Sequence, residues 1–338
     1  MSTQLYHHSA LFSEQGIRRI GVILVDGYAL ISLAATVEPL RAANILSKTK
    51  LYDFTFITAE GGRAQSSIGI AFDAIEMRSA PVDFDLVFLV AGGNPILYEN
   101  VELGHYLKRL TRQNVPLGGI SGAPAILARY GLMRHRRFTI HWEHFDSLKE
   151  MSQDFNLEKS LYVIDRDRYT SAGGTGTLDL LINIISKNHG RVLAQQVSDW
   201  FMHTETRLSE APQKAGLEQK YNIHHPAALA AVELMHNNLA DRLTLEEIAG
   251  RAHISARQLN RVFVEMLDMS VMEFYRHISL DRAAQLLKQT VLPISEVALA
   301  TGFSNASHFT RIFQARFATT PKAMRVAARA VAFDKERP

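Results

Sequence analysis

The sequence contains no cysteine among its 338 residues. This absence excludes a catalytic thiolate and a disulfide framework, because both require that side chain. Long apolar runs are also missing. No segment approaches the ~18 apolar residues of a membrane-spanning helix, and residues 1–17 hold no apolar core of signal-peptide length. These absences predict a cytoplasmic protein with no membrane partner.

Basic and acidic residues balance outside the C-terminal third of the chain. The whole sequence carries only +3, and residues 222–338 hold 14 Lys/Arg against 11 Asp/Glu, so the full excess lies there. No carboxylate interrupts the stretch from Ser304 to Arg329. Such a concentration is typical of a surface that binds phosphates. Its basic residues are Arg311, Arg316, Lys322, Arg325 and Arg329.

One helix-turn-helix pattern occurs twice in this basic third. Residues 248–263 and 297–313 carry it, and an offset of roughly fifty residues is typical of repeated structural units. In each copy a small residue allows two helices to cross closely, a turn residue tolerates positive φ, and a serine stands where an N-cap is needed. The equivalent pairs are Ala249 and Ala298, His253 and Gly302, Ser255 and Ser304, Leu259 and Phe309, Arg261 and Arg311, and Phe263 and Phe313.

Two capping boxes support the helix boundaries. Ser255 is followed three residues later by Gln258, and Thr244 is followed at the same spacing by Glu247. The pattern predicts that Thr244 opens the first helix of the first pair. It also predicts that Ser255 and Ser304 open the second helix of each pair.

Each second helix has an apolar face and an opposite face that is polar and basic. The polar faces supply the candidate DNA contacts. A solvated helix face is the alternative for a single pattern of this kind, and the aligned repetition favours DNA binding. The candidates are Arg257, Gln258, Asn260 and Arg261 in the first copy, and Asn305, Ser307, His308, Thr310 and Arg311 in the second.

Residues from about 225 to 327 resemble the DNA-binding domain of AraC/XylS regulators. The stretch from Gly302 to Phe313, with Thr320-Pro321 after it, is similar to the most diagnostic part of that family. The resemblance implies a linker helix over approximately Val271–Gln289, and two recognition helices in successive major-groove segments on one DNA face. Arg261 and Arg311 then become the favoured base or phosphate contacts. His253 departs from the glycine that many relatives carry there.

The other two thirds of the chain have an α/β pattern. Short β-branched runs alternate with helical patterns such as Ala34–Leu46 and Val101–Arg112, which predicts a parallel sheet flanked by crossover helices, a flavodoxin-like arrangement. Nearly 200 residues suffice for one sizeable core. The predicted strands are Ile20–Val25, Phe54–Thr58, Leu86–Val90 and Val115–Ile120.

Ligands of open parallel sheets bind beyond the carboxyl ends of the strands. Gly92, Gly93 and Asn94 follow one strand, Ser121 lies in a small-residue elbow after another, and residues 139–143 follow a further strand. A nucleophile elbow has this small-residue pattern. Together with Glu38, these segments resemble the ThiJ/PfpI branch of the class I glutamine amidotransferase-like superfamily.

In that superfamily the elbow residue is usually cysteine, a histidine follows about twenty residues later, and a glutamate reaches over from the first β-α connection. The resemblance gives His141 and Glu38 these positions, but Ser121 stands at the elbow. Three interpretations of Ser121 remain open. It fills a tight elbow, it contacts a ligand without catalysis, or it forms a serine amidase or hydrolase pair with His141.

An amidase-like domain ahead of an AraC/XylS module resembles the GlxA-type regulators, whose family role is to sense a small metabolite. Relatives with segments like His141–Glu143 and Ile164–Thr175 respond to cationic amino acids or quaternary-ammonium carboxylates. The resemblance implies that Trp142 faces a cation while Glu143 or Glu38 supplies countercharge. Backbone N–H groups at Gly92, Gly93 and the elbow would receive a carboxylate.

His141 and His144 have helical i, i+3 spacing, but no third metal ligand is evident. We therefore expect no metal, no cofactor and no catalytic residue. Residues 205–225 are polar, with Pro212 and Gly216, which indicates a linker.

The expected organisation comprises an N-terminal tail, a sensor and dimerisation domain, a linker, an all-α DNA-binding domain and a C-terminal tail. We predict a bacterial transcription regulator, an activator, that is nucleoid-associated when bound to its promoter operator. Its partners are double-stranded DNA, a small-molecule effector, RNA polymerase and a second copy of the chain. The five segments are 1–17, 18–204, 205–225, 226–327 and 328–338.

Overall fold

A computed structural model of the chain describes residues 16–59, 61–152, 154–214 and 216–334. The chain divides into two compact units, Met1–Gln213 and Lys214–Pro338. The expected N-terminal tail, residues 1–17, lies outside the described residues except for its last two positions. The expected linker, 205–225, spans the division between the units and contains a short helix, α7 (Leu217–Tyr221).

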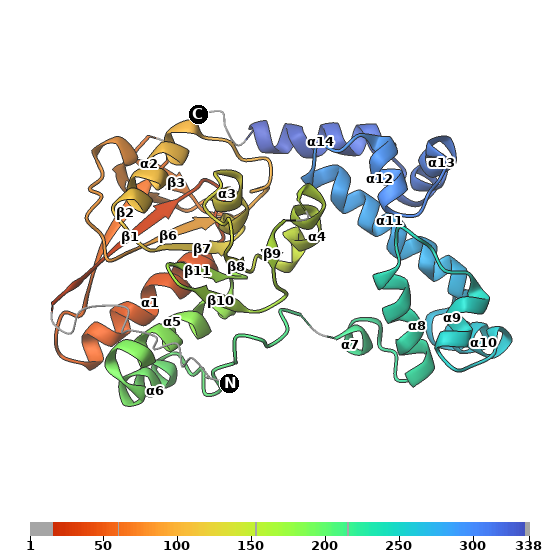
Figure 1. The fold of residues 1–338 in the computed structure, drawn as a ribbon, viewed down its shortest axis with the longest axis horizontal. Helices are drawn as coiled ribbons and strands as arrows, with labels where there is room; N and C mark the ends of the chain where they lie inside the picture. Colours follow the sequence, from red (N-terminus) through yellow and green to blue (C-terminus); the bar gives the residue numbers. More distant parts are fainter. Residues whose placement is uncertain (1–15, 60, 153, 215, 335–338) are drawn as a thin grey trace, which may run out of the picture. The chain divides into compact units, whose positions relative to one another are not determined.

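The first unit is built on a seven-stranded sheet (Figure 1). Neighbouring strands pair in parallel except β10 and β11, which are antiparallel. The predicted fold class, a largely parallel sheet with crossover helices, is therefore confirmed. In sheet order the strands are β10 (Tyr162–Asp165), β11 (Arg168–Ser171), β7 (Leu117–Ser121), β6 (Leu86–Ala91), β1 (Arg18–Leu24), β2 (Tyr52–Thr58) and β5 (Ile75–Glu76).

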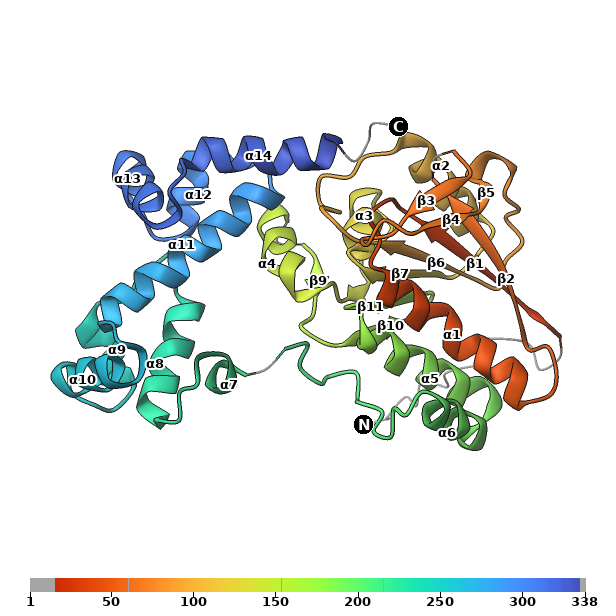
Figure 2. The same cartoon turned by 180° about the vertical axis from the view of Figure 1, so that it is seen from behind.

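Helices cover both faces of this sheet, as Figures 1 and 2 show from opposite sides. One face packs on α1 (Leu30–Leu46), α5 (Thr175–His189) and α6 (Arg191–Trp200). The other packs on α2 (Val101–Arg112) and α3 (Ala123–Arg129). Every residue of the central strand β6 is buried because both of its faces are covered. The two apolar cores lie on opposite sides of the sheet.

Smaller elements surround the sheet. A two-stranded hairpin pairs β3 (Arg63–Gln65) with β4 (Ala71–Asp73), and a 3-10 turn covers Met77–Ser79. The strand expected before Thr139 is β8 (Arg137–Phe138), which pairs with β9 (Asn156–Leu157) outside the main sheet. The prediction that residues 139–143 follow a strand is therefore correct only for this small separate sheet. Helix α4 (Trp142–Met151) begins within that segment, at its fourth residue.

The second unit is all-helical (Figure 1). Two helix-turn-helix pairs, α9–α10 and α12–α13, are joined by α11, which spans the predicted linker-helix range. Each pair has its own apolar core, and α11 contributes Phe274 to the first and Leu287 to the second. The helices are α8 (Pro226–Asn237), α9 (Leu245–Arg251), α10 (Ala256–Leu267), α11 (Val271–Gln289), α12 (Ile294–Ala300), α13 (Ala306–Phe317) and α14 (Pro321–Asp334).

Helix α14 runs to Asp334, so the segment expected as a C-terminal tail, 328–338, continues a helix over its first seven residues. Its last four residues lie outside the described part of the chain. Within the described ranges, none of the helices combines the length and the apolar character that crossing a membrane demands.

Candidate nucleic-acid interface and effector site

The first helix-turn-helix is built as its sequence predicts. His253 takes φ +55° at the turn, and Ser255 and Gln258 form a complete capping box at the start of α10. Thr244 and Glu247 form the second box at the start of α9. Hydrogen bonds from the Thr244 backbone and hydroxyl hold the pKa of the Glu247 carboxyl below its usual range.

The second turn corrects one prediction. Asn305, not Ser304, caps α13, because its Oδ1 accepts the backbone N–H groups of Ser307 at 2.9 Å and His308 at 3.0 Å. The cap lies two residues after His253 in the first copy and three residues after Gly302 in the second. The second turn therefore holds one extra residue. This insertion moves the cap position past the serine that the alignment of the repeats had favoured.

Gly302 combines a positive φ of +79° with close packing. A Cβ atom at this position would lie 2.4 Å from the side chain of Arg242 and 2.5 Å from the carbonyl oxygen of Leu239. No real Cβ occupies such a space without displacing its neighbours. The second turn can therefore form only around a glycine.

Arg242 connects the two helix-turn-helix cores. Its guanidinium carbon lies 4.7 Å from the Tyr275 ring centroid in the first core and 5.8 Å from that of Phe303 in the second. Burial lowers the pKa of Arg242. The residue stands in a loop with no periodic pattern, so nothing in the sequence signals this role.

The exposed face of α10 presents Arg257, Gln258 and Arg261. Arg261 pairs with Glu265 at 3.7 Å, an ion pair in which both side chains remain exposed. Asn260, the remaining predicted DNA contact of this helix, makes a hydrogen bond inside the protein. Its Oδ1 accepts the backbone N–H of Val271 at 3.0 Å and so joins α10 to the start of α11. That carbonyl has an internal structural role, because the first turn of α11 needs a hydrogen-bond acceptor.

The exposed face of α13 carries most of the DNA contacts predicted for the second helix-turn-helix. Ser307, His308 and Arg311 are exposed, and the Arg311 guanidinium lies 3.3 Å from the His308 ring nitrogen Nδ1. Thr310 donates its hydroxyl to the Ala306 carbonyl at 2.9 Å. A shallow surface hollow extends along this face and adds Gln314, which lies three residues after Arg311 on the same helical face. Its lining residues are Ala306, Ser307, Thr310, Arg311 and Gln314.

The basic stretch of the second unit is partly neutralised inside the protein. Arg316 pairs with Asp281 of α11 at 2.8 Å, although the sequence places no carboxylate near it. Burial and the neighbouring Arg329 lower the pKa of Arg325. Lys322 and Arg329 are exposed. The surface available to phosphates is therefore narrower than the linear sequence predicts.

In the first unit, the carboxyl ends of four neighbouring strands, β11, β7, β6 and β1, converge at one edge. Ser121 ends β7 with φ +62°, the sharp elbow that the sequence predicted, and is only 8% exposed. Gly173, after β11, stands against it, since a Cβ there would lie 2.6 Å from that of Ser121. Gly92, after β6, approaches Gly27 after β1, where an added Cβ would meet the carbonyl oxygen at 2.5 Å.

The structure does not bring Glu38 to this elbow. Ser32, in the first turn of α1, accepts the backbone N–H of Gly174 at 2.9 Å and is almost fully buried. Glu38 lies six residues, or about 9 Å, farther along the helix axis. Its carboxylate bonds the guanidinium of Arg41 at 2.6 Å. Ser32 was missed because it belongs to no sequence pattern that signals a site, whereas Gly174 lies within the Ile164–Thr175 segment named above.

His141, Trp142 and Glu143 meet at the start of α4. The His141 side chain caps the helix, since its Nδ1 accepts the Glu143 backbone N–H at 3.3 Å. The backbone N–H of His141 donates to the Ser121 carbonyl at 3.1 Å. The rings of His141 and Trp142 lie 5.2 Å apart, and the indole is 42% exposed. Ligand atoms of His141, Glu143 and His144 lie within 4.8 Å of one another. A third potential metal ligand, which the sequence did not reveal, is thus present.

Two family models match the chain. A helix-turn-helix domain covers residues 248–327, and the DJ-1/PfpI family covers residues 18–187. The HTH-type transcriptional regulator GlxA of Rhizobium meliloti is 36% identical, over 94% of this chain and 98% of its own length. The chain belongs to the GlxA-type family of transcriptional regulators.

Two further relatives are similar over almost as much of this GlxA-type chain. The regulator CdhR of Pseudomonas aeruginosa is 35% identical over 88% of this chain and 89% of its own. GbdR of the same species is 34% identical over 90% and 83%. All three relatives bear the name of HTH-type transcriptional regulators.

Membership in the GlxA-type family favours one of the two functional classes that the sequence left open. This chain is a DNA-binding transcriptional regulator with an AraC-type helix-turn-helix domain and a DJ-1/PfpI domain, and the amidase interpretation loses support. The DJ-1/PfpI family does include enzymes. In this regulator the Ser121 side chain is only 8% exposed and stands against Gly173.

Proposed function

We propose that this GlxA-type regulator binds a cationic amino acid or a quaternary-ammonium carboxylate in its first unit, without catalysis, and changes its DNA binding in response. The convergence of four strand ends on the Ser121 elbow, beside the Trp142 indole, carries the proposal. In open parallel sheets this edge is where ligands bind.

The proposed effector site has one end suited to a cation and another suited to a carboxylate. The exposed Trp142 ring offers its face to a positive charge, and the exposed Glu143 carboxylate supplies countercharge. Gly92, Gly93 and Asn94 follow β6, where backbone groups would receive the carboxylate of the ligand. Ser121 contributes a contact through the 8% of its surface that stays exposed at the elbow. Glu38 is left out because it pairs with Arg41.

The proposed DNA contacts come from the exposed faces of α10 and α13. Guanidinium groups bond guanine edges or phosphates, and hydroxyl and amide groups bond either. Asn260 and Asn305 are assigned to structural hydrogen bonds rather than to base reading, while Gln314 joins the group. The proposed contacts are Arg257, Gln258, Arg261, Ser307, His308, Thr310, Arg311 and Gln314.

We also propose an assembly. Two copies associate through residues 18–204, residues 226–327 bind a promoter operator, and the bound dimer activates transcription through RNA polymerase. The location we propose is the cytoplasm, with association to the nucleoid when the protein is bound to DNA. The pairing of a small-molecule sensor fold with a double helix-turn-helix supports this organisation.

A thermal-shift series tests the effector class. We expect glycine betaine, carnitine or L-arginine to raise the midpoint of one unfolding transition of the full chain in a dose-dependent way. A ligand at a hundred times its Kd stabilises the native state by about 2.7 kcal/mol. Trp142→Ala removes the shift, whereas Trp200→Ala, which truncates the other exposed tryptophan, preserves it. Equal shifts in both variants, or none with any compound, contradict the proposed site.

A Ser121→Ala variant tests the remaining hydrolase alternative. We expect unchanged effector-dependent DNA binding and no turnover of amide or ester substrates in either protein, because the Ser121 side chain packs against Gly173. The measurement combines a fluorescence-anisotropy DNA titration with a chromogenic amide and ester assay. Turnover by the wild-type chain that disappears in the variant would establish the enzyme instead.

A further inference from the structure

The segment from His203 to Gln213 leaves the sheet domain along a line of hydrogen bonds rather than as a loose connection. The segment begins three residues after Trp200, the last residue of α6, and Lys214 opens the second unit. We call residues 203–213 the strap. Three groups of contacts hold it to the first unit, at α5, at β10 and beside α4.

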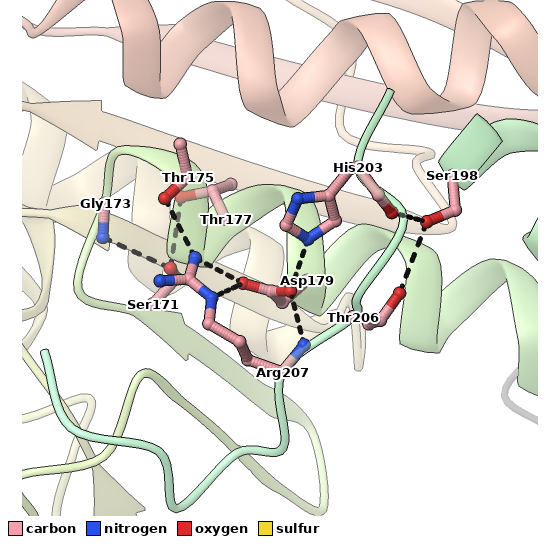
Figure 3. Close-up of polar contacts among 9 residues, drawn as sticks. All are labelled: Ser171, Gly173, Thr175, Thr177, Asp179, Ser198, His203, Thr206 and Arg207. Atoms are coloured by element: carbon pink, nitrogen blue, oxygen red, sulfur yellow. Dashed lines mark hydrogen bonds and ion pairs between the residues drawn. The ribbon is translucent and has the colours of Figure 1, made fainter. Parts of the chain in front are cut away.

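The first contact is a buried carboxylate on α5. Asp179 is fully buried, and its Oδ1 accepts the His203 ring Nε2–H at 2.8 Å and the Arg207 backbone N–H at 2.9 Å (Figure 3). Its Oδ2 accepts both Nε and Nη2 of Arg207, at 3.0 and 2.6 Å. A buried carboxylate held this way strongly resists losing its partner, because an uncompensated charge would remain.

The same arginine reaches the loop that lies against the elbow. Arg207 donates to the Thr175 hydroxyl at 2.8 Å, as Figure 3 shows. Thr175 begins α5 directly after Gly173 and Gly174, and Gly173 packs on Ser121. Only this short loop separates the strap from one wall of the proposed effector site.

The second and third contacts lie near the other wall. The Leu161 backbone N–H, just before β10, donates to the Ser209 carbonyl at 2.8 Å. The Gln213 amide nitrogen lies within hydrogen-bonding distance of three oxygens, at 3.0 Å from Thr139 Oγ1, 3.1 Å from the Ile140 carbonyl and 2.8 Å from the Ser160 carbonyl. Ile140 immediately precedes His141 and Trp142. The last strap residue therefore bonds the segment that carries the proposed cation-binding wall.

We infer that the strap couples effector binding to DNA binding, with Arg207 and Gln213 as positioning residues. Both are bonded to chain segments that adjoin the effector site, one beside Ser121 and the other beside Trp142. An effector that shifts either segment changes the strap bonds, and the strap continues directly into the DNA-binding unit. An allosteric response requires contacts that differ between two states, and we assign that role to the strap bonds. The inference rests on the effector site proposed above.

Gln213→Ala is the first test, because it removes side-chain bonds at the end of the strap without exposing a buried charge. Arg207→Lys is the second. It keeps the positive charge near Asp179 but loses the guanidinium fork. Gln195→Ala is the matched control, since its amide bonds Asp199 within the exposed surface of α6, at 2.9 Å.

Glycine betaine and L-arginine serve as probes for the full chain. Calorimetry measures probe binding, and anisotropy measures the Kd for a duplex selected by the protein, with and without the probe. For the wild type we expect the probe to change the DNA Kd by about 5- to 150-fold. Both strap variants should keep the probe affinity within about twofold, while the change in DNA Kd shrinks toward 1. The control should behave as the wild type.

Two outcomes overturn different statements. Strap variants that bind the probe and still transmit its full effect on DNA contradict the coupling role. Absence of probe binding by the wild type contradicts the proposed effector class. The role of the strap is then tested by the DNA affinity measured without any probe. Gln213→Ala should shift that affinity relative to Gln195→Ala, and equal affinities overturn the inference.

Discussion

Replacing Gly302 by alanine is expected to destabilise the second helix-turn-helix by about 2–5 kcal/mol. A left-handed backbone costs a residue with a Cβ atom about 1–2 kcal/mol, and overpacking adds about 1–3 kcal/mol. The new Cβ would lie 2.5 Å from the backbone oxygen of Leu239, which cannot swing away as a side chain can. Chemical denaturation of the full chain, followed by α-helical circular dichroism, measures the loss.

The first helix-turn-helix provides the control for this prediction. His253 occupies the equivalent turn position, already has a Cβ at φ +55°, and is exposed. His253→Ala should therefore change stability by less than about 0.5 kcal/mol, as most surface substitutions do. We expect Gly302→Ala to abolish specific DNA binding as well, because α13 starts from this turn. A Gly302→Ala protein that unfolds at the wild-type denaturant concentration would contradict the packing described.

Arg311→Ala is expected to weaken specific DNA binding by about 1–3 kcal/mol, or roughly 5- to 150-fold. The side chain is exposed on α13 and makes its hydrogen bond with His308 of the same helix, so its loss should leave folding intact. Anisotropy titrations at two salt concentrations separate base reading from phosphate binding. Arg109→Ala, an exposed arginine of α2 in the other unit, should leave the DNA Kd unchanged. Equal Kd values for Arg311→Ala and the wild type would remove this residue from the interface.

The parts of this protein that the sequence predicted are those set by local pattern. Residue spacing in the sequence predicted the paired turns, the two capping boxes and α11. Short runs of apolar residues predicted the central strands. The elbow at Ser121 was recognisable from its small neighbours. Each of these features depends on residues within a few positions of one another.

Contacts between distant segments could not be predicted. The start of α11 takes the carbonyl of Asn260, a predicted DNA contact, and Asp281 pairs with Arg316, which lies in a stretch free of carboxylates. Glu38 was expected at the elbow, but the direction of α1 leaves Ser32 there instead. No periodicity along the chain encodes such contacts, because they depend on how helices cross.

The contacts that hold the strap also join distant segments, so the sequence did not predict them. Asp179 and Arg207 stand 28 residues apart, one within a helix and the other in a segment expected to be a polar linker. A charged residue in a helical pattern is ordinarily assigned to the solvated face. Only the folded arrangement shows that this carboxylate is buried and that residues 205–213 belong to the first compact unit.

Hydroxyl-radical footprinting of the full chain on a duplex enriched from a random pool tests the central claim most directly. Two recognition helices of similar construction, α10 and α13, predict two protected segments on one face of the DNA, about 10 base pairs apart. Arg311→Ala should lose protection in one segment and retain it in the other. A single protected segment in the wild type, or uniform protection without sequence preference, would contradict the account of a regulator that reads DNA with both helix-turn-helix units.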